Sequence, residues 1–203
     1  MAQTFDPTQQ STLNDIEIGA RLVAALIHHV LKHGGAPIAY ADLLELGRFL
    51  DPHDAAMARA EVLGIAMKLR FVTDFCGAHG YPDLAALAVH PATGRPVPDP
   101  GGGWEAQRHA VAAFDWSPAQ AALAPYVRTV QATVPVRFKP RKERPAEVSW
   151  YAYFCAHRDA CKAVTSGDKR EVVNLVMAGL DPETALRRFL AAKAAHEAQG
   201  ALP

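Results

Sequence analysis

Apolar side chains at helical spacing organise the beginning of this chain. Between residues 14 and 33 they are Ile16, Leu22, Val23, Leu26, Ile27, Val30 and Leu31. This spacing is typical of a helix with one buried face. Asn14 and Glu17 resemble the capping box that opens such a helix, and Gly34 and Gly35 predict its end.

A β-bridge and two further helices are expected next. Residues 37–40 are too few for a longer strand. The second helix has an apolar face formed by Leu43, Leu44, Leu46 and Phe49. Asp51 and Pro52 suit the cap and first turn of a third helix, which we expect to run to about His79.

A β-hairpin is expected after the third helix. Residues 84–90 and 95–97 are its strands, and Gly94 suits the left-handed position of the turn between them. Helix, short strand, helix, long helix and hairpin follow one another in the order of a winged helix-turn-helix. In that fold the third helix enters the DNA major groove. We therefore expect a mostly α-helical protein with a small β-hairpin and a winged-helix-like N-terminal domain.

Residues 36–97 also resemble the winged-helix DNA-binding domain of the O6-alkylguanine DNA alkyltransferases. Residues 39–43 are similar to the segment that opens that domain, and residues 62–64 lie where the family has its small-residue recognition helix. Tyr81-Pro82, followed by an apolar strand and a Thr-Gly turn, is similar to the active-site strand. The resemblance implies DNA binding by this part of the chain.

Two departures from that family exclude its chemistry. The nucleophilic cysteine that follows the proline in the family is replaced by Asp83. Glu61 stands where the family has the arginine that enters the helix stack. The resemblance therefore implies a relative that does not transfer alkyl groups.

The chain divides into four parts. Residues 1–13 form a polar leader that we expect to be disordered, and residues 14–134 form the winged-helix-like domain with appended helices. Residues 135–147 form a basic linker, because prolines and charges there leave little apolar surface to bury. Residues 148–203 form a C-terminal unit of three helices.

The charge balance restricts where DNA could bind. Lys and Arg number 21, as do Asp and Glu, so contacts with DNA must come from a local patch. The cations of the third helix, hairpin and linker are the expected contacts: Arg59, Lys68, Arg70, Arg95, Arg137, Lys139, Arg141, Lys142 and Arg144.

Several classes of protein are disfavoured. No apolar stretch approaches the roughly 20 residues that span a bilayer, and the polar start is unlike a signal peptide. We therefore expect no membrane partner. The three cysteines form no disulfide framework, which indicates a cytoplasmic protein. Abundant Ala, and Arg in place of Lys, suggest a bacterial source.

No motif predicts catalysis, a metal or another cofactor. Cys76 and His79 have ligand-like spacing, as do Cys155, His157 and Cys161, but zinc usually needs four ligands in tight pairs. Buried apolar cysteines are the simpler interpretation. We expect a non-enzymatic protein without cofactor.

Two functions remain open. The first is binding of double-stranded DNA or a DNA-associated complex, as a regulator or accessory factor of a phage or plasmid. The alternative is a protein–protein interaction module that inhibits or adapts a host complex through its C-terminal helices. The sequence leaves the oligomeric state open.

Overall fold

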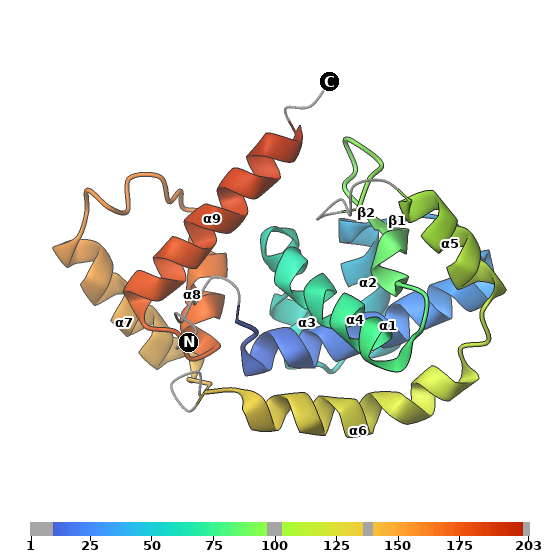
Figure 1. The fold of residues 1–203 in the computed structure, drawn as a ribbon. Helices are drawn as coiled ribbons and strands as arrows, with labels where there is room; N and C mark the ends of the chain where they lie inside the picture. The colour runs from blue at the N-terminus through green and yellow to red at the C-terminus, as the bar shows by residue number, and fades with distance from the viewer. Residues whose placement is uncertain (1–9, 97–102, 136–139, 201–203) are drawn as a thin grey trace, which may run out of the picture.

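The computed structural model describes residues 10–96, 103–135 and 140–200, with the side chains of residues 199 and 200 left out. It is mostly helical, as predicted (Figure 1). The α-helices of this part are α1 (Leu13–His33), α2 (Tyr40–Leu50), α3 (Ala55–Arg59), α4 (Ile65–His79), α5 (Trp104–Ala113), α6 (Ser117–Thr133), α7 (Glu143–Ala156), α8 (Lys169–Met177) and α9 (Pro182–Gly200). Two 3₁₀ turns, η1 (Val62–Gly64) and η2 (Leu84–Leu87), and two short strands, β1 (Ile38–Ala39) and β2 (Ala88–Val89), complete it.

Helix α1 begins earlier than predicted. The cap is Thr12, whose hydroxyl accepts from the Asp15 backbone N–H at 3.2 Å, while the Asp15 carboxylate accepts from the Thr12 N–H at 2.9 Å. This reciprocal pair replaces the predicted cap at Asn14. Gly34 ends the helix as expected, with φ +59°. The apolar stripe is buried except for Leu31, which is exposed.

The first hydrophobic core surrounds α1. Helices α2, α4 and α6 pack on it, and α6 runs beside α1 along the lower edge of Figure 1. Phe71, Phe75 and Trp116 are the largest side chains that are fully buried there. Phe49, which was expected to face this core, is exposed at the end of α2.

The predicted third helix is broken. Asp54, not Asp51, caps α3, because its carboxylate accepts from the N–H groups of Ala56 and Met57. The backbone is extended at Ala60, and η1 then leads into α4. The Arg48 guanidinium donates to the carbonyls at Met57 and Ala60, so a tertiary contact satisfies the groups that the break exposes.

The prediction of a β-hairpin is wrong. Residues 84–87 form η2, capped by Asp83, and β2 pairs in parallel with β1, with Ile38 opposite Ala88. The carboxylate of Asp83 accepts from the N–H of Ala85 and so turns the chain into a 3₁₀ helix instead of a strand. The turn itself forms, with Gly94 at φ +63°, but residue 97 lies outside the described residues.

The helices after residue 103 have few side-chain caps. Pro125 lies inside α6 without interrupting it, and at the start of α6 the Asp115 carboxylate accepts from the backbone N–H of Ser117 at 3.0 Å and from its hydroxyl at 2.7 Å. Helix α7 begins at Glu143, so its first turn contains part of the segment expected to be linker.

A second hydrophobic core joins the last three helices. Trp150 of α7, Val172 and Val176 of α8 and Phe189 of α9 are buried together. Leu63 of η1 packs against this core from the N-terminal side. The last three helices therefore share a hydrophobic core of their own.

Two glycines test the contact between α1 and α4. A methyl group at Gly19 would lie 2.7 Å from the Phe71 ring, whereas one at Gly77 meets nothing within 4 Å. We expect Gly19→Ala to lower the free energy of unfolding by about 1–3 kcal/mol through overpacking. Gly77→Ala should raise it by about 0.5–1 kcal/mol, since Ala favours the helix. Urea denaturation measures both, and shifts of the same sign would contradict this packing.

Candidate functional site

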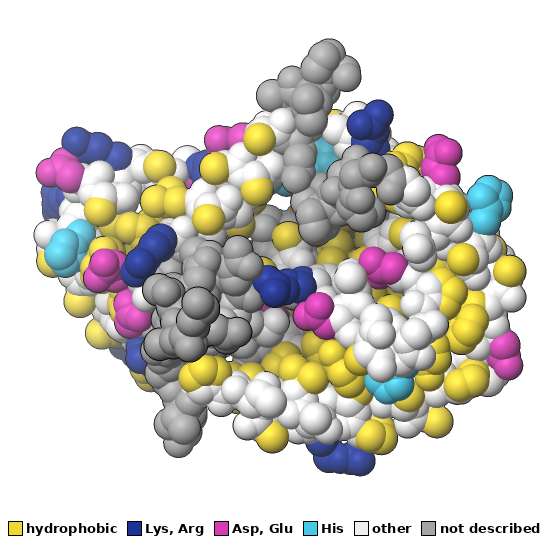
Figure 2. All heavy atoms as spheres, viewed as in Figure 1, with side chains coloured by type: hydrophobic (Ala, Val, Ile, Leu, Met, Phe, Trp, Pro, Cys, Tyr) yellow, Lys and Arg dark blue, Asp and Glu magenta, His cyan; other side chains and the backbone are white. Residues whose placement is uncertain are grey.

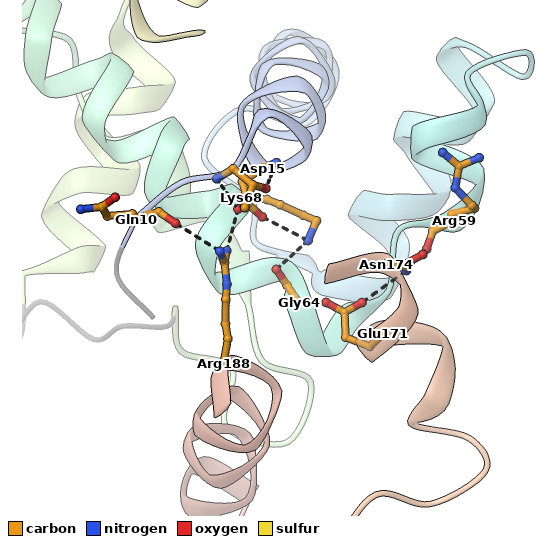
Figure 3. A network of polar contacts seen from close by, with 9 residues as sticks. Gln10, Asp15, Arg59, Gly64, Lys68, Glu171, Asn174 and Arg188 are labelled. Carbon is orange, nitrogen blue, oxygen red and sulfur yellow. Dashed lines mark hydrogen bonds and ion pairs between the residues drawn. The ribbon is translucent and has the colours of Figure 1, made fainter. Parts of the chain in front are cut away.

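Buried charged side chains meet between the two cores (Figure 3). They are Asp15 of α1, Lys68 of α4, Glu171 of α8 and Arg188 of α9, and none is more than 5% exposed. Charged groups this deep are rarely found without partners, because water no longer solvates them. The contact between the units is therefore polar at its centre.

Asp15 is the best connected member of this cluster. Its carboxylate accepts from the Arg188 guanidinium at 2.6 Å and from the Thr12 hydroxyl at 2.8 Å, and Lys68 Nζ lies 3.7 Å away. Arg188 also donates to the carbonyl oxygen of Gln10 at 3.1 Å. Burial alone would raise the pKa of Asp15, but Arg188, Lys68 and Thr12 together hold that pKa below its ordinary value. Asp15 is thus the ionised centre of the network.

Glu171 is less well satisfied. Its hydrogen bond from Asn174 Nδ2 is long, at 3.5 Å, and burial raises the pKa of its carboxyl although Lys68 opposes that shift. The carboxyl lies so close to Gly64 that a methyl group there would overlap it. Lys68 Nζ donates to the Gly64 carbonyl at 2.9 Å, so this part of η1 is held tightly.

A groove of about 710 Å³ opens beside the cluster, between α4 and α9. In Figure 1, α9 runs past the beginning of α4. The side chains on its two walls are apolar and mostly small: Leu63, Ala66, Met67, Ala191, Ala192 and Ala195. The buried charges border its floor. The volume lies within the range of roughly 300–1,000 Å³ that is usual for binding pockets.

The groove continues past Arg70 and Asp74 into a second hollow of about 390 Å³. That hollow is more polar and is bordered by Gln10, Ser11 and Thr133. The combined surface is elongated, apolar at one end and polar at the other.

A smaller pocket of about 100 Å³ lies on the other side of the cluster and brings together Arg59, Lys68 and Arg141. Arg141 lies far from the other two cations in the sequence. The Arg59 guanidinium points away from Glu171 in Figure 3, and its backbone carbonyl accepts from Asn174 Nδ2 at 2.9 Å. The pocket is therefore not a ring of converging cations.

The expected DNA contacts are scattered. Lys68 is wrong as a phosphate contact, because it is 3% exposed and its ammonium is engaged inside the protein. Arg70, Arg95, Arg141, Lys142 and Arg144 are exposed, and Arg59 is half-buried. Arg137 and Lys139 lie outside the described residues. On the face seen in Figure 2, cationic and anionic side chains are interspersed.

The outer face of α4 is also poorly placed to enter DNA. Ala66, Met67, Arg70, Thr73 and Asp74 all border the groove that α9 closes on its other side. A recognition helix must fit with its exposed face into a major groove about 12 Å wide. Here α9 stands opposite that face.

Sequence reasoning missed three of the four buried charges. The capping pair expected from the sequence is Asn14 and Glu17, which leaves Asp15 without a role, and Glu171 follows Asp168 at the spacing of a helix cap. Arg188 does carry a signal in the sequence, because Ala185 three residues before it and Ala192 four residues after it place it on an apolar face of the helix.

No protein-family model, curated protein or solved structure matched this chain at a significant level. None of the described helices has the length and apolar character needed to cross a membrane. Nor does the described part of the chain hold a group of three or more His, Cys, Asp or Glu side chains that could bind a metal ion. Burial raises the pKa of the Cys76 thiol to about 12, which makes it a poor nucleophile.

Glu171→Gln tests the electrostatics of the cluster. Since the pKa of Glu171 is raised, folding disfavours its ionised form, and the free energy of unfolding falls as pH rises above the ordinary Glu pKa of about 4.3. Gln carries no such penalty. We expect the variant to match the unchanged protein near pH 4 and to be more stable by about 1 kcal/mol near pH 8 in urea denaturation.

The control for this comparison is Glu183→Gln on α9, whose side chain is 70% exposed. It should leave the stability nearly unchanged at both pH values. A stability difference for Glu171→Gln that does not grow with pH would show that the carboxyl is not destabilised by burial.

Proposed function

We propose that this chain is a non-enzymatic protein-interaction module and that its partner binds in the α4–α9 groove. The observation that carries the proposal is the groove itself, an elongated apolar surface between two helices with polar groups at one end. Grooves of this kind commonly receive the apolar face of an amphipathic helix. The alternative function considered from the sequence is therefore favoured over DNA binding.

The walls indicate the chemistry of the partner. Ala66, Ala191, Ala192 and Ala195 are small, so the backbone of a third helix can approach closely. The partner segment we propose is an amphipathic helix, with apolar side chains between α4 and α9. Polar side chains would follow where Arg70 and Asp74 begin the second hollow.

Binding of DNA or of a DNA-associated complex is the second proposal. It is supported by the exposed cations Arg141, Lys142 and Arg144, which lie within a few residues of one another at the start of α7. We also propose a cytoplasmic location, because Cys76, Cys155 and Cys161 are all free.

Filling the groove tests the first proposal. The probe is a fluorescein-labelled amphipathic peptide made of Leu, Ala, Ser and Gln. Fluorescence anisotropy measures its binding to the protein. Ala192→Trp places a large ring in the groove and should weaken peptide binding at least about tenfold, or 1.4 kcal/mol. Ala194→Trp is the matched control, because Ala194 is exposed on the same helix and does not border the groove.

The outcomes separate the two functions. Absence of saturable peptide binding, or equal weakening by both substitutions, would contradict the groove as the binding site. A labelled DNA duplex titrated over a series of salt concentrations forms the other arm. Tight binding of the duplex that weakens steeply with salt would favour the DNA proposal instead.

A further inference from the structure

The C-terminal unit is attached to the first core by polar contacts on both sides of the groove. From α8, Asn174 donates to the Arg59 carbonyl at 2.9 Å, and Arg170 pairs with Glu61 at 3.1 Å. From α9, Arg188 pairs with Asp15 at 2.6 Å. Widening the groove requires the Asp15–Arg188 pair to part and α9 to shift against η1, which it also contacts, while the α8 contacts hold.

Apolar contact between the units is limited. The two cores are separate clusters, and among the described residues that precede α7, Leu63 of η1 and Val134 are the apolar side chains that pack against the second cluster. Units joined mainly by polar contacts move relative to one another more readily than units that share a hydrophobic core. The α7–α9 unit is thus able to move as a body.

We propose that the Asp15–Arg188 ion pair is a latch that sets the width of the α4–α9 groove, with the α8 contacts as the hinge. A buried ion pair contributes little net stability compared with the same groups in water, because burial removes their hydration. Closed and open forms therefore differ by little free energy, and a partner that prefers the open form shifts the population toward it. The use of the latch rests on the function proposed above, but its existence does not.

Distances between spin labels test the latch without any partner. One label is attached to the native Cys155, which is exposed on α7, and the other to Ala78→Cys, at an exposed position near the end of α4. The buried Cys76 and Cys161 are left in place. We expect one narrow distance distribution in the otherwise unchanged protein and a second, distinct population in Arg188→Met.

Arg187→Met is the matched control. Arg187 neighbours Arg188 but is exposed and pairs only weakly with Glu183, at 3.9 Å. The distribution of spin-label distances in Arg187→Met should therefore match that of the unchanged protein. If Arg188→Met fails to fold, as judged by circular dichroism, Arg188→Lys keeps the charge but cannot reach both Asp15 and Gln10 at once. It should then show the second population to a smaller extent.

A distribution that is the same in Arg188→Met, or Arg188→Lys, as in the unchanged protein would overturn the latch. The peptide probe shows whether the latch serves binding. Affinity should rise several-fold in Arg188→Met, because the open form no longer has to be generated first. A second distance population without peptide binding would support the latch and contradict the proposed function. Peptide binding without a second distance population would support the proposed function and contradict the latch.

Discussion

The Asp15 carboxylate supports both halves of the molecule. Within the first core it closes the capping box of α1 with Thr12, and across the interface it pairs with Arg188. Removing one partner of a buried ion pair leaves an uncompensated charge, which costs about 3–5 kcal/mol. The start of α1, the position of Lys68 and the attachment of α9 therefore depend on one side chain.

This arrangement explains why the groove lies where it does. Two units with separate cores meet through charged groups, and the groove between α4 and α9 opens directly beside these groups. The apolar faces that remain are lined by small side chains from both helices. A surface of this kind suits a third helix better than a DNA backbone, because the exposed side of α4 carries Asp74 as well as Arg70.

Much of the helical layout could be predicted from the sequence, because it depends on local signals. Gly34 ends α1 and His79 is the last residue of α4, both as expected, and the apolar spacing placed most of α1 correctly against the core. The break after α3 could not be predicted, since it is stabilised by Arg48 from another helix. The prediction of a hairpin was wrong for a similar reason, because β2 pairs with β1, a strand that lies far away in the sequence.

The candidate site was harder to predict than the fold. Lys68 was expected on the surface because lysine side chains are usually exposed. No local sequence pattern shows that its ammonium lies beside the buried carboxylate of Asp15. Glu171 resembled a cap residue because it follows Asp168 at cap spacing. Which charged side chains become buried depends on which helices pack together. Here it depends on the tertiary packing of α1, α4, α8 and α9.

Asp15 and Arg188 join the two units, and a double-mutant cycle tests this contact most directly. The free energy of unfolding is measured for the unchanged protein, Asp15→Asn, Arg188→Met and the double variant. We expect a coupling energy of about 1–3 kcal/mol between the two sites. Additive effects within about 0.5 kcal/mol would contradict the account, because they would show that the two side chains do not interact.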